Sequence, residues 1–522
     1  MKVALVQPPL TLRNPKWLPQ VQPPIGVAYI AAALRAAGHT VRVVDAVGEG
    51  IGRCTRFRDD RYAYGLPIDE ILDRIGGDTE AIGVGIMFSN FWPLSKRLIG
   101  ALRTRFPSAA IICGGEHVTA LPRLVIEDAP VDYSVIGEGE ETTVELLAHL
   151  SGAPGRLPLE RIAGLAYRTA DGAIVTTPPR QRRRAVDRIP WPAWDLFPLE
   201  QYFDARLFGA MSFDPTQRPM VILGTRGCPY TCKFCSNEGM WGINYFMRDP
   251  KDVVDEMELY VRRYGATDFH FQDLTLIINN RWAHKLCDEI LARNLNITWK
   301  TASGTRSEAL DLDLLRKMSR SGCDEVVLAP ESGSPEIGRV TRKRVRLDKI
   351  LDVARMVRDH AVPMRVRGLM IMGNPEERLR DVLQTYAYLV RMARAGFSSV
   401  SMHRFTAYPG SEYHDVALRN GEIVHNDEYF LSMGLSFPFG RVSWHPHWNG
   451  GFIFLLLMLA YCVFFATYYL SKPVEIGHSA WSVVRKRPRT RLERYLAYRL
   501  WGDLTTRQRG DVTQDAPTSL SV

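Results

Sequence analysis

Short apolar runs alternate with amphipathic stretches over residues 1–150, which is the pattern of a parallel sheet covered by helices. Gly26–Ala37 is predicted as the first helix, because its apolar residues recur at helical spacing and Gly38 provides a left-handed stop. The pattern indicates an α/β, Rossmann-like domain over this range. The predicted strands are Val3–Val6, Val41–Val44, Ile82–Met87, Ala109–Cys113 and Tyr133–Ile136.

Glycines follow the fourth and fifth of these strands. Gly114-Gly115 comes directly after Cys113, and Gly137-Glu138-Gly139 comes directly after Ile136. Glycine lets the backbone turn sharply, and open α/β sheets bind ligands at the carboxyl edge of their strands. The sequence therefore predicts a ligand site at this edge of the first sheet.

Residues 151–215 are predicted to form a linker with little structure of its own. Asp171-Gly172 indicates a hairpin between Leu165–Arg168 and Ala173–Thr177. The basic stretch Arg180–Arg184 is expected to stay solvated, although it could also steer an anionic substrate.

A second series of alternating strands and helices occupies residues 216–410. Six such units indicate an open, partial (β/α)6 barrel, in which active-site groups follow the carboxyl ends of the strands. The predicted strands are Val221–Thr225, Asp268–Gln272, Thr298–Thr301, Glu325–Ala329, Pro363–Met372 and Ser399–Thr406, with helices near 250–264, 281–293, 311–320, 347–360 and 380–395.

The region 411–505 is predicted to be mainly helical, and residues 506–522 are predicted to be a disordered polar tail. Within this region the segment 451–470 carries no charge and is long enough to span a bilayer. A single span would place the two α/β regions and the basic run 485–494 on opposite faces of the membrane, which is unfavourable. We therefore expect docking on a membrane surface first, a buried helix second and a true span last.

Charge and cysteine content narrow the class of protein. A net charge of +9 over 522 residues is modest and argues against a nucleic-acid binder. Eight cysteines, three of them within eight residues, do not resemble a secreted disulfide framework. The apolar run at the N-terminus is too short for a signal peptide, so a cytoplasmic location is expected.

The three clustered cysteines, Cys228, Cys232 and Cys235, have the spacing C-x3-C-x2-C and directly follow a predicted strand. Thiolates bind iron–sulfur clusters or zinc, and a closed site of either kind takes four protein ligands. Three local ligands leave one iron of a [4Fe-4S] cluster open to a small molecule. A zinc site completed by a distant Cys or His is the alternative.

With Phe234 beside the third cysteine and a position after the first barrel strand, this motif resembles the radical S-adenosylmethionine (SAM) superfamily. The resemblance covers residues 185–410 and implies a [4Fe-4S] cluster, SAM and a reductant such as flavodoxin or ferredoxin. For Asp273 a helix N-cap is an alternative role, and for Glu331 a surface carboxylate is. The residues that the resemblance assigns to SAM binding are Phe234, Asp273, Ser303, Glu331 and Gly368.

The first domain resembles the cobalamin-binding domain that one class of radical SAM enzymes carries. The motif that supplies a histidine to cobalt in other cobalamin proteins is absent, so no such ligand is predicted, and His117 is expected near the edge of the corrin. A degenerate domain that binds nothing is the alternative. The cobalamin contacts that the resemblance implies are Ser89, Asn90, Gly114, Gly115, Glu116, His117, Gly137 and Glu138.

This resemblance implies a C-methyltransferase that acts on an unactivated carbon of an apolar substrate, either lipid-like, a tetrapyrrole or a secondary metabolite. Fold and cofactors do not fix the reaction, so an oxidative cyclase or hydroxylase of the anaerobic magnesium-protoporphyrin monomethyl ester cyclase type is the first alternative. A non-catalytic cobalamin sensor is an alternative of another class. The sequence assigns no catalytic side chain.

Overall fold

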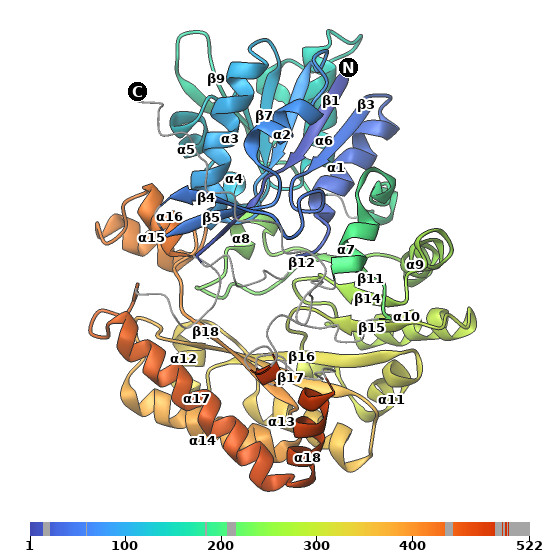
Figure 1. Ribbon diagram of the computed structural model, residues 1–522, viewed down its shortest axis with the longest axis vertical. Helices are drawn as coiled ribbons and strands as arrows, with labels where there is room; N and C mark the ends of the chain where they lie inside the picture. Colours follow the sequence, from blue (N-terminus) through green and yellow to red (C-terminus); the bar gives the residue numbers. More distant parts are fainter. Residues whose placement is uncertain are drawn as a thin grey trace.

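Two sheets, each covered by helices, form the two ends of the computed structural model (Figure 1). The structure describes residues 1–13, 21–58, 60–182, 185–205, 216–433 and 442–485, with positions 493, 496, 497 and 500. The predicted tail 506–522, Arg183, Arg184 and most of the basic run 485–494 lie outside the described residues. The α/β class predicted for both halves is confirmed.

The first sheet has seven strands in the order β10-β9-β8-β7-β6-β1-β3, and its five parallel strands are the predicted ones. Helices α1 (Ile25–Ala36) and α6 (Gly139–Leu150) share one hydrophobic core, and α3 (Trp92–Arg105) lies in another. The carboxyl ends of these strands point toward the second sheet (Figure 1). The bounds of the strands are β1 Lys2–Gln7, β3 Thr40–Asp45, β6 Ala81–Gly85, β7 Ala110–Gly114 and β8 Tyr133–Val135.

The predicted hairpin belongs to the first sheet and not to a linker. Strand β9 (Leu165–Arg168) pairs antiparallel with β8, and β10 (Ile174–Thr176) follows at the edge. Leu165 and Ile162 are fully buried in the core under α6, so burial of apolar side chains holds the hairpin on the sheet.

The arginine-rich stretch after the hairpin is not solvated in its described part. The guanidinium of Arg180 donates to Thr142 Oγ1 at 2.7 Å and to Glu141 Oε2 at 3.1 Å. Arg182 donates to Glu138 Oε2 at 2.8 Å. These ion pairs tie the chain to α6 and correct the expectation of free, solvated side chains.

A small antiparallel sheet beside the first domain was not predicted. It consists of β2 (Leu10–Leu12), β5 (Arg61–Tyr64) and β4 (Cys54–Arg58). These strands are only three to five residues long, and β4 and β5 contain arginines, so the sequence offers no sustained apolar alternation by which to identify them. Helix α7 (Leu199–Ala205) follows the first sheet in the chain and precedes the barrel.

The second sheet is a parallel open barrel whose six strands lie in chain order, as predicted. Phe269, Trp299 and Val326 pack into the core that the sheet shares with the outer helices. The strands are β11 (Pro219–Ile222), β14 (Asp268–Phe271), β15 (Thr298–Thr301), β16 (Cys323–Glu331), β17 (Arg365–Met372) and β18 (Ser399–Arg404), and the helices are α9 (Pro250–Tyr264), α10 (Asn280–Ala292), α11 (Leu312–Arg320), α13 (Leu347–Asp359) and α14 (Leu379–Ala395).

A buried network of charged side chains lies on the other face of these strands. Lys300 Nζ lies 3.0 Å from Asp268 Oδ2, and His270 Nε2 lies 2.8 Å from the same oxygen. Burial would raise the pKa of Asp268, but its bond to His270 and the charge of Lys300 outweigh burial and lower that pKa to about 2. Arg367 Nε and Glu325 Oε1, 3.1 Å apart, continue the network.

Replacing Lys300 by methionine should destabilise the protein strongly. The methionine keeps most of the side-chain volume but leaves the buried Asp268 without its cation, so the free energy of unfolding should fall by about 3–5 kcal/mol. Urea unfolding followed by tryptophan fluorescence measures the change. In the matched control, Lys251→Met removes an exposed ion pair to Asp255 on α9 and should leave the free energy of unfolding nearly unchanged, because solvent screens that pair. Equal losses in the two variants would contradict the interpretation.

Helix α17 (Gly450–Ser471) contains the predicted apolar segment and packs beside α14 and β18 (Figure 1). Tyr386 on α14 donates its hydroxyl to Leu456 O at 2.8 Å, and the main chain of Met402 donates to Tyr461 Oη at 3.0 Å. One face of the helix therefore covers the outside of the barrel. The other C-terminal helices are α15 (Glu412–Arg419) and α16 (Asp427–Ser432), which lie beside the first domain (Figure 1), and α18 (Val474–Val484), which follows α17.

Candidate active site

The three cysteines lie in the loop between β12 (Thr225–Gly227) and α8 (Asn237–Trp241), where the two sheets face each other. The loop is held by its main chain. Asn237 Nδ2 donates to Cys228 O at 3.0 Å, and Lys233 N donates to Thr341 O at 3.0 Å. Gly227 has φ +90°, and a Cβ there would lie 2.1 Å from Asn244 O, so only glycine fits before Cys228.

The thiols have the chemistry that a cluster requires. Burial raises the pKa of all three, to about 12 for Cys235, whereas the cations Lys343 and Arg306 oppose this effect at Cys228 and Cys232. Such cations favour thiolates and an anionic cluster. Among the described residues, no group of three or more His, Cys, Asp or Glu side chains is placed to hold a single metal ion.

Two of the predicted SAM-binding residues lie at this loop, Phe234 within it and Glu331 next to it. Glu331, at the end of β16, accepts a hydrogen bond from Lys343 Nζ at 2.9 Å, and the same ammonium lies 6.0 Å from the Phe234 ring centre. Glu331 has φ +64°, an unfavourable value for a side-chain-bearing residue, which is typical of functional positions. The side chain of Glu331 is 15% exposed and its carboxylate is paired with Lys343, which differs from a free surface carboxylate.

Asp273 is buried beneath the start of the cysteine loop. Its carboxylate accepts from Gly224 N at 3.1 Å, from Thr225 N and from Thr225 Oγ1 at 2.6 Å. Burial raises its pKa to about 6 against these bonds. The alternative role as a helix N-cap is wrong, because Asn279 caps the next helix. The carboxylate holds the main chain three residues before Cys228.

The remaining two SAM assignments stay predictions. Ser303 lies in the loop that follows β15, at the carboxyl end of the barrel. Gly368 lies within β17, where a Cβ would lie 2.4 Å from Met392 Cε of α14. The absence of a side chain at Gly368 therefore serves the packing of α14 against the sheet.

Among the predicted cobalamin contacts, His117 is buried, whereas Ser89 and Glu116 are half-buried. Glu116 hydrogen-bonds Ser236, the residue after Cys235, so this loop of the first domain touches the cysteine loop. His117 Nδ1 lies 2.9 Å from Ser89 Oγ, and its ring packs between Trp92 and Phe430. Burial lowers the pKa of His117 to about 3, so the ring is neutral. Asn90 is buried beside Ser89.

The carboxyl edge of the first sheet also presents an apolar surface. Met87 and Phe88, which follow β6, are 49% and 44% exposed. Gly115 and Gly137 both have positive φ, and Gly137 N donates to Thr119 Oγ1 at 2.9 Å. Exposed apolar side chains beside glycine turns suit a large, flat ligand such as a corrin. The sequence had placed Met87 inside a buried strand and did not indicate Phe88.

Arg226 links the two domains directly in front of the cysteines. Its guanidinium lies 3.0 Å from Glu138 and 2.7 Å from Glu140, and it stacks on Tyr29 at 4.6 Å. Glu138 is engaged through both oxygens, since Arg182 binds the other one. Burial raises the pKa of Glu138, but these two arginines outweigh burial and lower it. Glu138, predicted as a cobalamin contact, thus holds the domains together; the sequence did not indicate this role for either arginine.

Comparison with known families agrees with this arrangement. The B12 binding domain matches residues 18–147, which hold the glycine loops, and the Radical SAM superfamily matches residues 222–389, which hold the cysteine loop. The chain thus carries a region that matches the radical SAM superfamily, preceded by a region that matches a B12 binding domain. The family resemblance that the motifs indicated is thereby confirmed, and it implies a [4Fe-4S] cluster, SAM and cobalamin as cofactors of this enzyme.

The relatives of this radical SAM enzyme are named for two different reactions, a methyl transfer and a cyclisation. It is 28% identical to cytidylyl-2-hydroxyethylphosphonate methyltransferase of Streptomyces wedmorensis, over 86% of this chain and 87% of the relative. It is 26% identical to the anaerobic magnesium-protoporphyrin IX monomethyl ester cyclase of Rubrivivax gelatinosus, over 71% and 62%. The fold resembles that of the radical SAM methyltransferase TsrM of Kitasatospora setae, with a TM-score of 0.60, 19% identity and coverage of 80% and 76%.

Proposed function

We propose that this enzyme is a cobalamin-dependent radical SAM C-methyltransferase. The observation that carries the proposal is the contact between the two cofactor-binding loops, made where Glu116 of the first domain meets Ser236 beside Cys235. When bound, the cluster and SAM supply a radical that removes a hydrogen atom from carbon, and cobalamin supplies a methyl group. The relative with the greater coverage is a methyltransferase, which favours this reaction over the cyclase.

The protein's own residues would hold the parts in place. Cys228, Cys232 and Cys235 would bind the cluster, while Lys343 and Arg306 favour the ionised thiols. Asp273 fixes the main chain in front of the first cysteine. The three cysteines are half-buried where the two sheets face each other, and partial shielding from water strengthens charge interactions there.

Labelled SAM separates methylation from cyclisation. The enzyme is reconstituted anaerobically and incubated with trideuteromethyl-labelled SAM and a small-molecule extract of a host that expresses it. A product carrying the labelled methyl group should form, and its formation should require added cobalamin. A product that lacks the label would instead support the cyclase or hydroxylase alternative. The absence of 5′-deoxyadenosine from the reduced protein would support the non-catalytic sensor.

We further propose a cytoplasmic enzyme that meets an apolar substrate at a membrane surface. Helix α17 is long and apolar enough to cross a membrane, but its inner face packs on the barrel, which favours docking over spanning. On its outer face Leu455 and Leu459 are exposed, and Trp481 and Val484 of α18 are exposed as well. Basic residues follow α18 in the sequence and would attract anionic lipids.

Vesicle binding tests this docking. The full chain should cosediment with vesicles containing phosphatidylglycerol and should bind weakly to pure phosphatidylcholine vesicles. Replacing both Leu459 and Trp481 by serine should reduce cosedimentation by about tenfold, because burial of two large apolar side chains contributes at least 1.4 kcal/mol. Equal sedimentation of the variant and the unaltered protein would refute the docking.

A further inference from the structure

A strongly basic segment borders the cysteine loop. Five of the eight residues 339–346 are Arg or Lys, and none is acidic. Its main chain touches the loop, because Thr341 O accepts from Lys233 N at 3.0 Å and the Cys232 thiol approaches Arg342 O at 4.0 Å. The segment therefore separates the cysteine loop from the outer surface.

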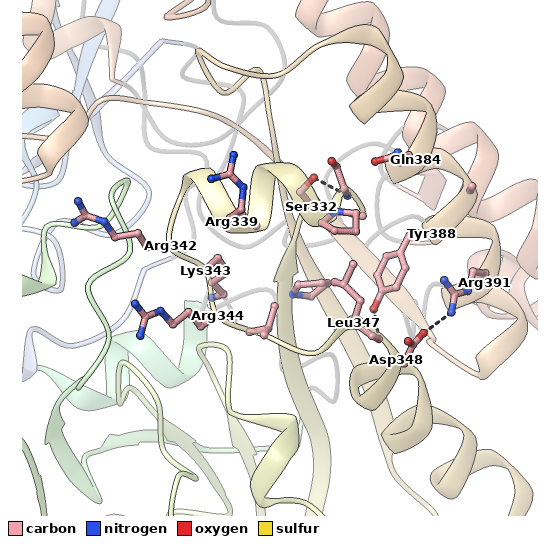
Figure 2. Close-up of a pocket in the computed structure, with 17 residues that line it drawn as sticks. Ser332, Arg339, Arg342, Lys343, Arg344, Leu347, Asp348, Gln384, Tyr388 and Arg391 are labelled. Atoms are coloured by element: carbon pink, nitrogen blue, oxygen red, sulfur yellow. Dashed lines mark hydrogen bonds and ion pairs between the residues drawn. The ribbon is translucent and has the colours of Figure 1, made fainter.

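The outer side of this segment lines a pocket of about 770 Å³ between α12 (Pro335–Val340), α13 and α14. Figure 2 shows Arg339, Arg342 and Arg344 on one side of the pocket and Tyr388 and Arg391 on the other. Five lining residues are basic and only Asp348 is acidic, so the pocket attracts anions. We call the pocket and the segment 339–346 the basic groove.

Neighbouring carboxylates neutralise the basic groove only in part. Glu336 pairs with Arg339, Glu412 with Arg342, Glu331 with Lys343 and Asp348 with Arg391. Within the described part of the chain, the exposed side chains of Arg344 and Arg346 have no ion pair. The groove therefore presents positive charge that no acidic residue of the described chain offsets.

We propose that the basic groove docks the acidic face of a small electron-transfer protein of the flavodoxin or ferredoxin class. The inference rests on the proposed function, because a cluster at the cysteine loop must receive one electron, and the donor loses that electron. Electron transfer slows steeply with distance, and the groove is a surface whose main chain touches a cluster ligand. An acidic donor would thus be attracted to a place from which transfer is short.

Charge reversal tests the docking in the reconstituted full-length enzyme. The variant Arg344→Glu with Arg346→Glu removes the two unpaired cations. The control, Arg156→Glu with Arg161→Glu, makes the same change of charge at two exposed arginines of the loop before β9, in the first domain. Stopped-flow bleaching of the cluster absorbance by flavodoxin hydroquinone gives the reduction rate, and titration calorimetry with oxidised flavodoxin gives binding without turnover.

In the groove variant, reduction by flavodoxin should be at least about tenfold slower at low salt, and the difference should shrink as salt is added. The control variant should change by less than about twofold, and reduction by methyl viologen should be unchanged in both. An unaltered rate in the groove variant, or equal slowing of both variants, would overturn the docking site. Failure of the proposed function would appear differently, as no 5′-deoxyadenosine from the unaltered enzyme with methyl viologen.

Discussion

Replacing Cys232 by alanine should leave the enzyme without its cluster and without detectable turnover. The three cysteines supply every protein ligand that the loop offers, and a cube held by two thiolates loses its anchorage beside Lys343. Iron and acid-labile sulfide should fall to background in anaerobically reconstituted protein. The electron paramagnetic resonance signal of the reduced cluster and the formation of 5′-deoxyadenosine should disappear with them.

A second cysteine provides the matched control for this variant. Cys462 is exposed on α17, away from the cysteine loop, so Cys462→Ala should retain iron, sulfide and 5′-deoxyadenosine formation at the level of the unaltered enzyme. If Cys232→Ala bound as much iron and sulfide as Cys462→Ala, the assignment of the cluster to the triad would be wrong.

The elements of the barrel could be predicted closely because their signal is local. Helix α9 has the bounds expected from its apolar period, and the six strands appear in the expected order. The cysteine triad is equally local, since its spacing alone carries its chemistry. The predicted first barrel strand is the exception: Gly224 separates it into β11 and the start of β12, which forms a separate hairpin with β13 (Tyr245–Met247).

The parts that could not be predicted depend on contacts between distant residues. Arg226 and Glu138 are 88 residues apart, and Asp273 binds Thr225 over 48 residues. The sequence placed these carboxylates at the carboxyl edges of strands, which is where they lie, but it could not give the direction of the side chains. Both point to arginines or main-chain amides that hold loops in place.

Glu138 and Asp273 therefore share one physical role, which is to hold the cysteine loop in place. A carboxylate shielded from water is stable only when cations or amides satisfy it, and here Arg226 and the amides of Gly224 and Thr225, which lie in the segment that leads to Cys228, are among those partners. The position of the cysteine loop relative to both domains is therefore fixed before any cofactor binds. Such preorganisation lowers the cost of placing reacting groups.

Gly115→Ala should weaken cobalamin binding strongly. Gly115 has φ +113°, a conformation almost restricted to glycine, and an added Cβ would lie 2.5 Å from Ile86 O at the end of β6. The loop that carries Glu116 and the edge that carries Met87 would then have to move apart. The substitution adds a strain of about 3 kcal/mol, which is released only when this loop and the edge of the sheet move apart. The affinity for cobalamin should therefore fall by about 100-fold. Titration with hydroxocobalamin, followed by absorbance, measures the loss.

Gly100→Ala provides the matched control, because the substitution is the same and the surroundings differ. Gly100 lies within α3, where an added Cβ meets no atom within 4 Å, so alanine should raise the stability by up to about 1 kcal/mol and leave cobalamin affinity unchanged. Iron and sulfide content should be normal in both variants, since the cysteine loop is intact. Tight cobalamin binding by Gly115→Ala would show that the loop after β7 does not form the corrin site.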